Sequence, residues 1–128
     1  MKKRLVHRKK GEDPRILSVS YDELLLRMRH LLLEREGYQV VSSRGFTESL
    51  EHCKRGGFDL FILGHSIPHL DKERLVHTFR EVSAAPVVSL RRNPAEQLVP
   101  GADYHIEPDP EELLSVATRA LGRKPATK

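Results

Sequence analysis

The sequence predicts an α/β fold in which one doubly wound parallel sheet of five strands carries helices on both faces. Strand-like and helix-like segments alternate five times along the 128 residues. The clearest strand, Leu60–Leu63, is apolar at every position, which indicates a strand covered on both faces, as in a parallel sheet. The single cysteine, Cys53, rules out an internal disulfide, and a domain of this size needs none.

The first strand is expected at Arg15–Val19, and Asp22 can cap the helix that follows it. Gly37 ends that helix, at the position where a left-handed residue is expected. Leu26 and Leu33 fall off the main apolar stripe, one heptad apart, and are either a docking surface for a partner or second copy, or part of a wide core-facing stripe. Four apolar residues recur at helical spacing and are predicted to form the core-facing stripe: Leu24, Met28, Leu31 and Leu32.

The second strand is predicted at Tyr38–Val41, and the next helix begins at Thr47. Cys53 lies on the apolar side of that helix, so we expect a buried small side chain rather than a nucleophile. After the strand Leu60–Leu63, a third helix is expected from about Asp71 to Val82.

The fourth and fifth strands are predicted at Pro86–Leu90 and Asp103–Ile106. The last helix has a strong start, with Asp109 as the N-cap, Pro110 in the first turn and Glu112 in capping-box relation to the cap. The segment between these two strands contains two prolines within seven residues. We therefore expect the fourth helix to be shortened to one or two turns or replaced by a loop.

The positive charge of the chain is concentrated at its beginning. Residues 1–14 hold six basic and two acidic residues, a balance of +4 that equals the net charge of the whole chain. The remaining residues sum to zero, so the charge does not indicate a nucleic-acid-binding face on the fold. We expect residues 1–14 to form a disordered basic tail, 15–122 the domain and 123–128 a C-terminal tail. With no secretory leader or membrane-length apolar run, we expect a cytoplasmic protein.

Two stretches carry a resemblance to a known family. In Phe58-Asp59-Leu60-Phe61-Ile62-Leu63-Gly64-His65-Ser66-Ile67-Pro68, a buried strand is followed by a proline at the spacing found in receiver domains of two-component response regulators. Gly101-Ala102-Asp103-Tyr104, then Glu107-Pro108, looks like the family's fifth strand and the approach to its last helix. The sequence thus resembles a receiver from Arg15 to about Gly122. The resemblance implies a flavodoxin-like fold with strand order 2-1-3-4-5.

Receivers accept a phosphoryl group from a histidine kinase on an aspartate, with Mg²⁺ as the cofactor, and the resemblance places the aspartate on Gly64. The acidic pair that holds the metal in receivers falls on Ser20 and Tyr21. The Thr or Ser that follows the phosphoryl group falls on Arg91, and the Lys before the proline falls on Glu107. Gly64 has no side chain to phosphorylate. Since Mg²⁺ is normally held by carboxylates, we expect neither aspartyl phosphorylation at this position nor a metal or other cofactor.

Neighbouring residues offer weaker alternatives. His65 could be a phosphohistidine and Ser66 a phosphoserine, but neither has a paired base in the sequence. His65, His69 and Asp71 lie close enough along the chain to be considered as metal ligands, yet their spacing matches no strong zinc pattern. In each case an ordinary loop residue is the simpler interpretation.

The replacements suggest a fixed structure in place of a switch. Arg91 and Glu107 are expected at the carboxyl ends of adjacent strands, where they could form an ion pair that fills the former active site. Alternatively, both point to solvent, or Arg91 and Arg92 hold a small anion. Tyr104 falls on the family's switch aromatic, which either responds to partner binding or is a half-buried strand tyrosine.

The sequence therefore predicts a stand-alone degenerate receiver, not an enzyme, that acts as a phosphorylation-independent protein-interaction module in signalling or regulation. Its expected partners are signalling proteins, with a homodimer as a further option and no membrane. The alternative is a nucleic-acid-associated regulator that uses the basic tail. Binding to DNA or RNA that is lost on deletion of residues 1–14 would distinguish the two. A flavodoxin-like enzyme is a third interpretation, but no catalytic constellation supports it.

Overall fold

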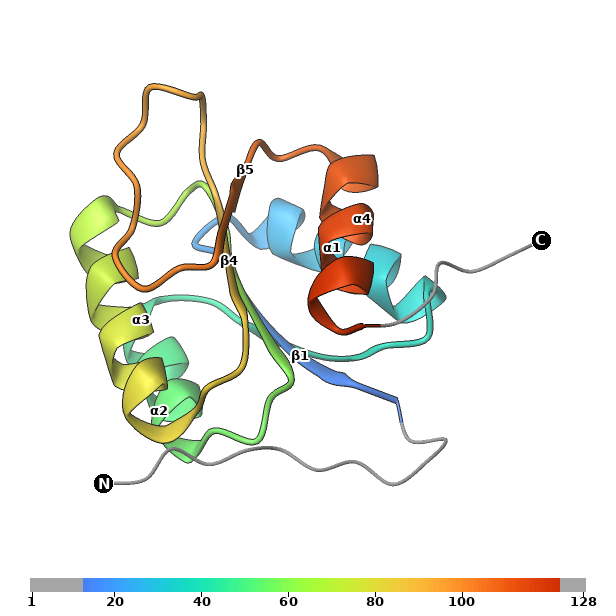
Figure 1. Ribbon diagram of the computed structural model, residues 1–128, viewed down its shortest axis with the longest axis horizontal. Helices are drawn as coiled ribbons and strands as arrows, with labels where there is room; N and C mark the ends of the chain where they lie inside the picture. The colour runs from blue at the N-terminus through green and yellow to red at the C-terminus, as the bar shows by residue number, and fades with distance from the viewer. Residues whose placement is uncertain (1–12, 123–128) are drawn as a thin grey trace.

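The computed structural model describes residues 13–122, and its architecture is a five-stranded parallel sheet between two layers of helices (Figure 1). The strand order is β2-β1-β3-β4-β5, and all four strand pairs are parallel. This confirms the predicted fold class and strand order. The strands are β1 (Arg15–Val19), β2 (Gln39–Ser43), β3 (Leu60–Leu63), β4 (Val87–Leu90) and β5 (Tyr104–Ile106). The helices are α1 (Glu23–Arg35), α2 (Phe46–Arg55), α3 (His69–Val82) and α4 (Pro110–Ala120).

The sheet separates two apolar cores, because successive side chains of a strand point to opposite faces. In β3, Phe61 and Leu63 pack on the face covered by α2 and α3, whereas Leu60 and Ile62 pack on the face covered by α1 and α4. Figure 1 shows these two helix pairs on opposite sides of the sheet. All four β3 residues are fully buried, as the continuous apolar run predicted.

The predicted caps set the helix ends. The Asp22 carboxylate accepts a hydrogen bond from the Leu25 amide at 3.0 Å, and Asp109 accepts one from the Glu112 amide at 3.2 Å. Gly37, just beyond α1, has a φ of 91°, which favours glycine at that position. Small differences remain, since α3 begins two residues earlier than predicted, at His69.

A loop replaces the helix that would connect β4 to β5. Residues 91–103 form turns and bends without a helix, in agreement with the expectation from the two prolines, and Figure 1 shows this segment as a long orange loop. The loop is tied to the domain at several points. Val99 is buried and its amide donates to His105 Nε2 at 3.0 Å. Arg80 of α3 donates to the Gly101 carbonyl at 2.9 Å.

The predicted orientation of α1 is wrong. Leu26 and Leu33 face the sheet and are buried, whereas Leu24, Met28 and Leu31 are 56–65% exposed. These exposed residues lie roughly half a turn from Leu26 at 3.6 residues per turn. Apolar residues surround most of this helix, so periodicity alone did not select the buried side. The buried side of α1 is the one whose Leu33 packs into the core between the sheet and the helices α1 and α4.

The terminal segments fall largely outside the described residues. The predicted basic tail 1–14 is described only from residue 13, and the predicted tail 123–128 is not described. Within residues 13–122, no helix combines the length and apolarity that crossing a bilayer requires.

Candidate functional site

The carboxyl ends of the strands meet at one edge of the sheet, and ligands of open α/β sheets bind at this edge. Pairing of Val19 with Leu63 and of Leu63 with Ser89 brings the ends of β1, β3 and β4 side by side. Pairing of Leu90 with Ile106 adds the end of β5. The structure therefore brings together the strand ends that are followed by Ser20, Gly64, Arg91 and Glu107.

Hydroxyl groups occupy the end of β1. Ser20 Oγ lies 3.1 Å from Ser66 Oγ, and the Tyr21 amide donates to the same Ser66 oxygen at 3.0 Å. The Tyr21 hydroxyl donates to the Asp71 carboxylate at 2.7 Å. Burial, followed by this hydrogen bond, raises the pKa of the Tyr21 phenol above its ordinary value. The Asp22 carboxylate caps α1 instead of facing the other strand ends.

A buried arginine lies against the backbone at the end of β3. A Cβ atom added to Gly64 would lie 3.3 Å from Arg29 Nη1, 3.1 Å from the Val19 carbonyl oxygen and 3.2 Å from Ser20 Cβ. Arg29 is only 8% exposed. The Arg29 guanidinium of α1 therefore lies in the space next to any side chain that residue 64 could carry. Sequence reasoning missed Arg29, although its place between Leu26 and Leu33 on the helix was a signal.

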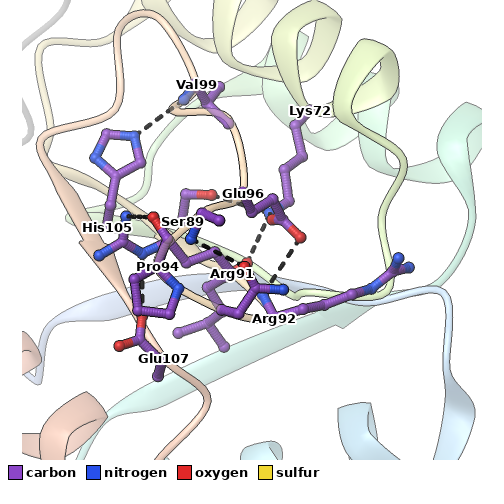
Figure 2. Close-up of polar contacts among 12 residues, drawn as sticks. Lys72, Ser89, Arg91, Arg92, Pro94, Glu96, Val99, His105 and Glu107 are labelled. Carbon is purple, nitrogen blue, oxygen red and sulfur yellow. Dashed lines mark hydrogen bonds and ion pairs between the residues drawn. The ribbon is translucent and has the colours of Figure 1, made fainter.

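A buried lysine reaches the end of β4. Lys72 of α3 is 1% exposed, and its Nζ donates to Ser89 Oγ at 3.0 Å and to the Leu90 carbonyl oxygen at 2.6 Å. Glu96 of the loop is 3.6 Å from the same nitrogen. Figure 2 shows the lysine extending from the helix toward these groups. Burial lowers the pKa of the Lys72 ammonium, while Glu96 acts in the opposite direction.

Lys72 was also missed by the sequence interpretation. It lies three and four residues before Leu75 and Val76, and thus on the buried side of α3. A lysine within a buried helical stripe is uncommon unless it is paired. That position was the available signal.

Arg91 and Glu107 form an ion pair, which is one of the alternatives that the sequence left open. Arg91 Nε lies 3.0 Å from Glu107 Oε2, and the two side chains are 21% and 42% exposed. Figure 2 shows the pair next to Lys72 and Glu96. Arg92 donates its amide hydrogen to Glu96 at 3.3 Å. The pair therefore lies at the solvent-facing side of the crevice, whereas Arg29 and Lys72 are buried.

We expect the Arg91–Glu107 pair to contribute little to stability, because partly exposed pairs are weak. A double-mutant cycle with Arg91→Met and Glu107→Gln should give a coupling free energy of about 0.2–1 kcal/mol that falls as salt is added. The exposed Arg44–Glu23 pair, at 3.1 Å, is a matched control expected at the lower end of that range. A coupling above about 2 kcal/mol for Arg91 and Glu107 would contradict this view of the pair.

The remaining candidates have separate surroundings. His69 Nε2 lies 2.7 Å from a Glu73 carboxylate oxygen, and Asp71 is bound by Tyr21, so His65, His69 and Asp71 do not converge as metal ligands. Tyr104 is half-buried and packs against the core between the sheet and α1 and α4. Cys53 is fully buried, and burial raises the pKa of its thiol to about 12, in agreement with a structural role.

The crevice does not fit the Mg²⁺ ion that the resemblance implies. That ion requires carboxylate ligands, and the carboxylates near the crevice are committed to other groups in the described structure. Asp22 caps α1, Asp71 accepts from Tyr21, and Glu107 pairs with Arg91. No group of three or more acidic, histidine or cysteine side chains in residues 13–122 is arranged to hold a metal.

Comparison with known proteins agrees with the fold. No protein-family model matches the chain. The chain is 32% identical to the uncharacterized transcriptional regulatory protein YkoG of Bacillus subtilis, over 91% of this chain and 54% of that protein. It is also 32% identical to the transcriptional activator protein PfeR of Pseudomonas aeruginosa, over 88% of this chain and 39% of that protein. The chain thus spans about half or less of the length of these relatives.

Solved receiver domains have the same architecture. The receiver domain of a Pseudomonas aeruginosa sensor histidine kinase, solved with a magnesium ion in its active-site cleft, aligns with a TM-score of 0.76 at 18% identity, covering 87% of this chain and 99% of that one. A two-component response regulator from Clostridium difficile aligns with a TM-score of 0.75 at 21% identity, covering 87% and 98%.

These findings show which fold the chain has. The chain has the CheY-like, flavodoxin-type fold of response-regulator receiver domains, and its sequence relatives are transcriptional regulators. Within that fold, the described residues of this chain place a glycine and the side chains of arginine and lysine at the strand ends.

Proposed function

We propose that the chain is a degenerate receiver that acts as a phosphorylation-independent protein-interaction module in signal transduction or regulation. The observation that carries this proposal is Gly64 at the end of β3, with the Arg29 guanidinium beside it. A glycine offers no oxygen that could accept a phosphoryl group. On this proposal the protein catalyses no reaction of its own and works in the cytoplasm.

The electrostatics of the crevice support the proposal. Mg²⁺ and two cationic side chains would repel one another in a partly buried site, and Arg29 and Lys72 are both buried there. The Lys72 ammonium is held by a serine hydroxyl and a backbone carbonyl. This arrangement favours a fixed structure over a metal-dependent switch.

An apolar surface on α1 supports an interaction role. Leu24, Met28 and Leu31 are each more than half exposed on one side of this helix. Clusters of exposed large apolar side chains mark interaction surfaces more often than isolated ones do. We propose that this side of α1 contacts a partner protein, and that the contact is independent of phosphorylation.

Phosphorylation is the decisive test. The full chain incubated with labelled acetyl phosphate and Mg²⁺ should incorporate no label, while an active receiver treated in parallel does. Gly64→Asp should stay unlabelled as well, because Arg29 would pair with the new carboxylate and no acidic pair is available to hold the metal. Acid-stable or acid-labile label on the wild-type chain would overturn the proposal.

The interaction surface has its own test. A partner captured by the full chain from the native host should bind equally with and without acetyl phosphate. Leu24→Glu with Leu31→Glu should lower its affinity at least tenfold. Leu70→Glu, at an equally exposed leucine on α3, is the matched control and should bind normally. Loss of binding in the control alone would place the interface elsewhere and contradict the assignment to α1.

The nucleic-acid alternative depends on residues 1–14, most of which lie outside the described residues. The sequence relatives of the chain are transcriptional regulators, but the chain spans only 54% and 39% of the length of the two described above. This alternative and the homodimer remain predictions.

A further inference from the structure

A cavity of about 270 Å³ opens between α1 and α4 at the same end of the sheet. Its walls are apolar for the most part. Leu25, Met28 and Leu32 of α1 form one side, and Leu90 and Leu113 contribute to the other. Such a mainly apolar pocket with a few polar groups is the usual form of a small-molecule site.

Two polar side chains that line this cavity each bury one nitrogen atom without a hydrogen-bond partner among the described residues. Arg29 is more than nine-tenths buried, and its Nη1 has no hydrogen-bond acceptor among the described residues. His65 lines the same cavity, and its buried Nδ1 likewise has no partner within residues 13–122. A buried charge without a hydrogen-bonded counter-ion is costly, so Arg29 favours an anion that reaches it.

Among the described residues that line the cavity, no carboxylate meets this need. Asp109 is the acidic residue among those that line the cavity, and its carboxylate accepts from the Glu112 amide at the start of α4. Asp109 is exposed to solvent, whereas Arg29 is buried. Gly64 matters here too, because an aspartate at that position would bring a carboxylate next to Arg29 Nη1.

We propose that this cavity binds a small organic carboxylate with an apolar body, of the size of a medium-chain fatty acid. The carboxylate pairs with the Arg29 guanidinium, beside the His65 ring that lines the same cavity. The aliphatic chain lies between the leucines of α1 and α4. At about 270 Å³ the cavity is slightly smaller than the usual range of ligand sites, roughly 300–1,000 Å³, which favours octanoate over long-chain fatty acids.

This inference goes beyond the proposed function and does not rest on it. A protein-interaction module need not bind a small molecule, and a ligand at this cavity need not alter phosphorylation. A ligand bound at this site would be a signal that reaches the protein without phosphorylation.

The experiment compares octanoate with neutral octanol and cationic octylamine by calorimetry on the full chain. Octanoate should bind saturably and at least tenfold more tightly than either. Amide shifts on octanoate addition should concentrate around Leu32, His65 and Leu113, not around Leu70 on the far face of the sheet. Equal affinity for octanoate and octanol, or shifts centred on the far face, would overturn the proposal.

Variants separate the charge from the shape of the cavity. Arg29→Met should reduce octanoate affinity to the level of octanol, while Arg27→Met, at an exposed position of the same helix, should not. Gly64→Asp provides a second route if Arg29→Met fails to fold, because its carboxylate should compete with the ligand. Gly64→Asn adds the same bulk without charge and should bind at least tenfold more tightly than Gly64→Asp. Equal binding by these two variants would contradict a role for the Arg29 charge.

Discussion

Replacing Lys72 with alanine is expected to lower the free energy of unfolding by about 3 kcal/mol. The substitution removes a fully buried four-carbon stem, which leaves a cavity. It also removes the donor to Ser89 Oγ and the Leu90 carbonyl, and hydrogen bonds from charged donors contribute on the order of 1.5–3 kcal/mol. Urea unfolding with an unchanged m-value measures the difference.

Lys72→Met is the matched control, since it restores most of the buried volume without the ammonium. We expect it to cost about half as much as Lys72→Ala, because the desolvation of the charge is relieved while the Leu90 carbonyl loses its donor. An alanine variant within about 1 kcal/mol of the wild type would show that the lysine does not stabilise the crevice.

The stability difference between the wild type and Lys72→Met should depend on pH. Burial lowers the pKa of the Lys72 ammonium in the folded protein, whereas the unfolded chain keeps an ordinary value of about 10.4. Between these two values the unfolded state binds more protons, so the wild type should gain stability relative to the variant as pH rises toward about 10.4. Below the folded-state pKa the difference should be constant. A difference that shrinks with rising pH would contradict the lowered pKa.

Phe61→Ala is expected to lower the free energy of unfolding by about 3–5 kcal/mol. Phe61 is fully buried in the centre of the sheet, and its ring centroid lies 4.8 Å from that of Phe79 on α3. The loss is a large part of the roughly 5–15 kcal/mol that stabilises a typical domain. Chemical denaturation should show a lower midpoint.

The control is Leu70→Ala, on the same helix as Phe79 but 58% exposed. We expect it to change stability by no more than about 0.5 kcal/mol. Similar losses for the two variants would mean that α3 does not pack on β3 as described.

The fold could be predicted from the sequence because its signals are local. The run Leu60–Leu63 is apolar at every position, and this alone predicted a strand covered on both faces. The structure shows all four residues buried. Asp22, Asp109 and Gly37 mark helix ends through contacts that span only a few residues. The prolines between β4 and β5 likewise predicted that the helix between these strands would be shortened or replaced by a loop.

The candidate site was predicted in part. The neighbouring positions of Arg91 and Glu107 followed from the parallel sheet, since both residues lie at the ends of adjacent strands, whereas the sequence left open whether they pair. The two buried cations did not follow, because Arg29 and Lys72 reach the crevice from helices. The burial of a long side chain depends on how its helix is rotated, and the predicted rotation of α1 was wrong.

The sequence by itself determined the order of elements, the caps, the parallel sheet and the glycine at the end of β3. Each of these depends on residue types at fixed spacing. The tertiary structure alone decided which side of α1 is buried and where the ends of long cationic side chains lie. Those outcomes depend on packing between segments far apart in the chain, where Leu33 meets the sheet and Arg29 lies against Gly64.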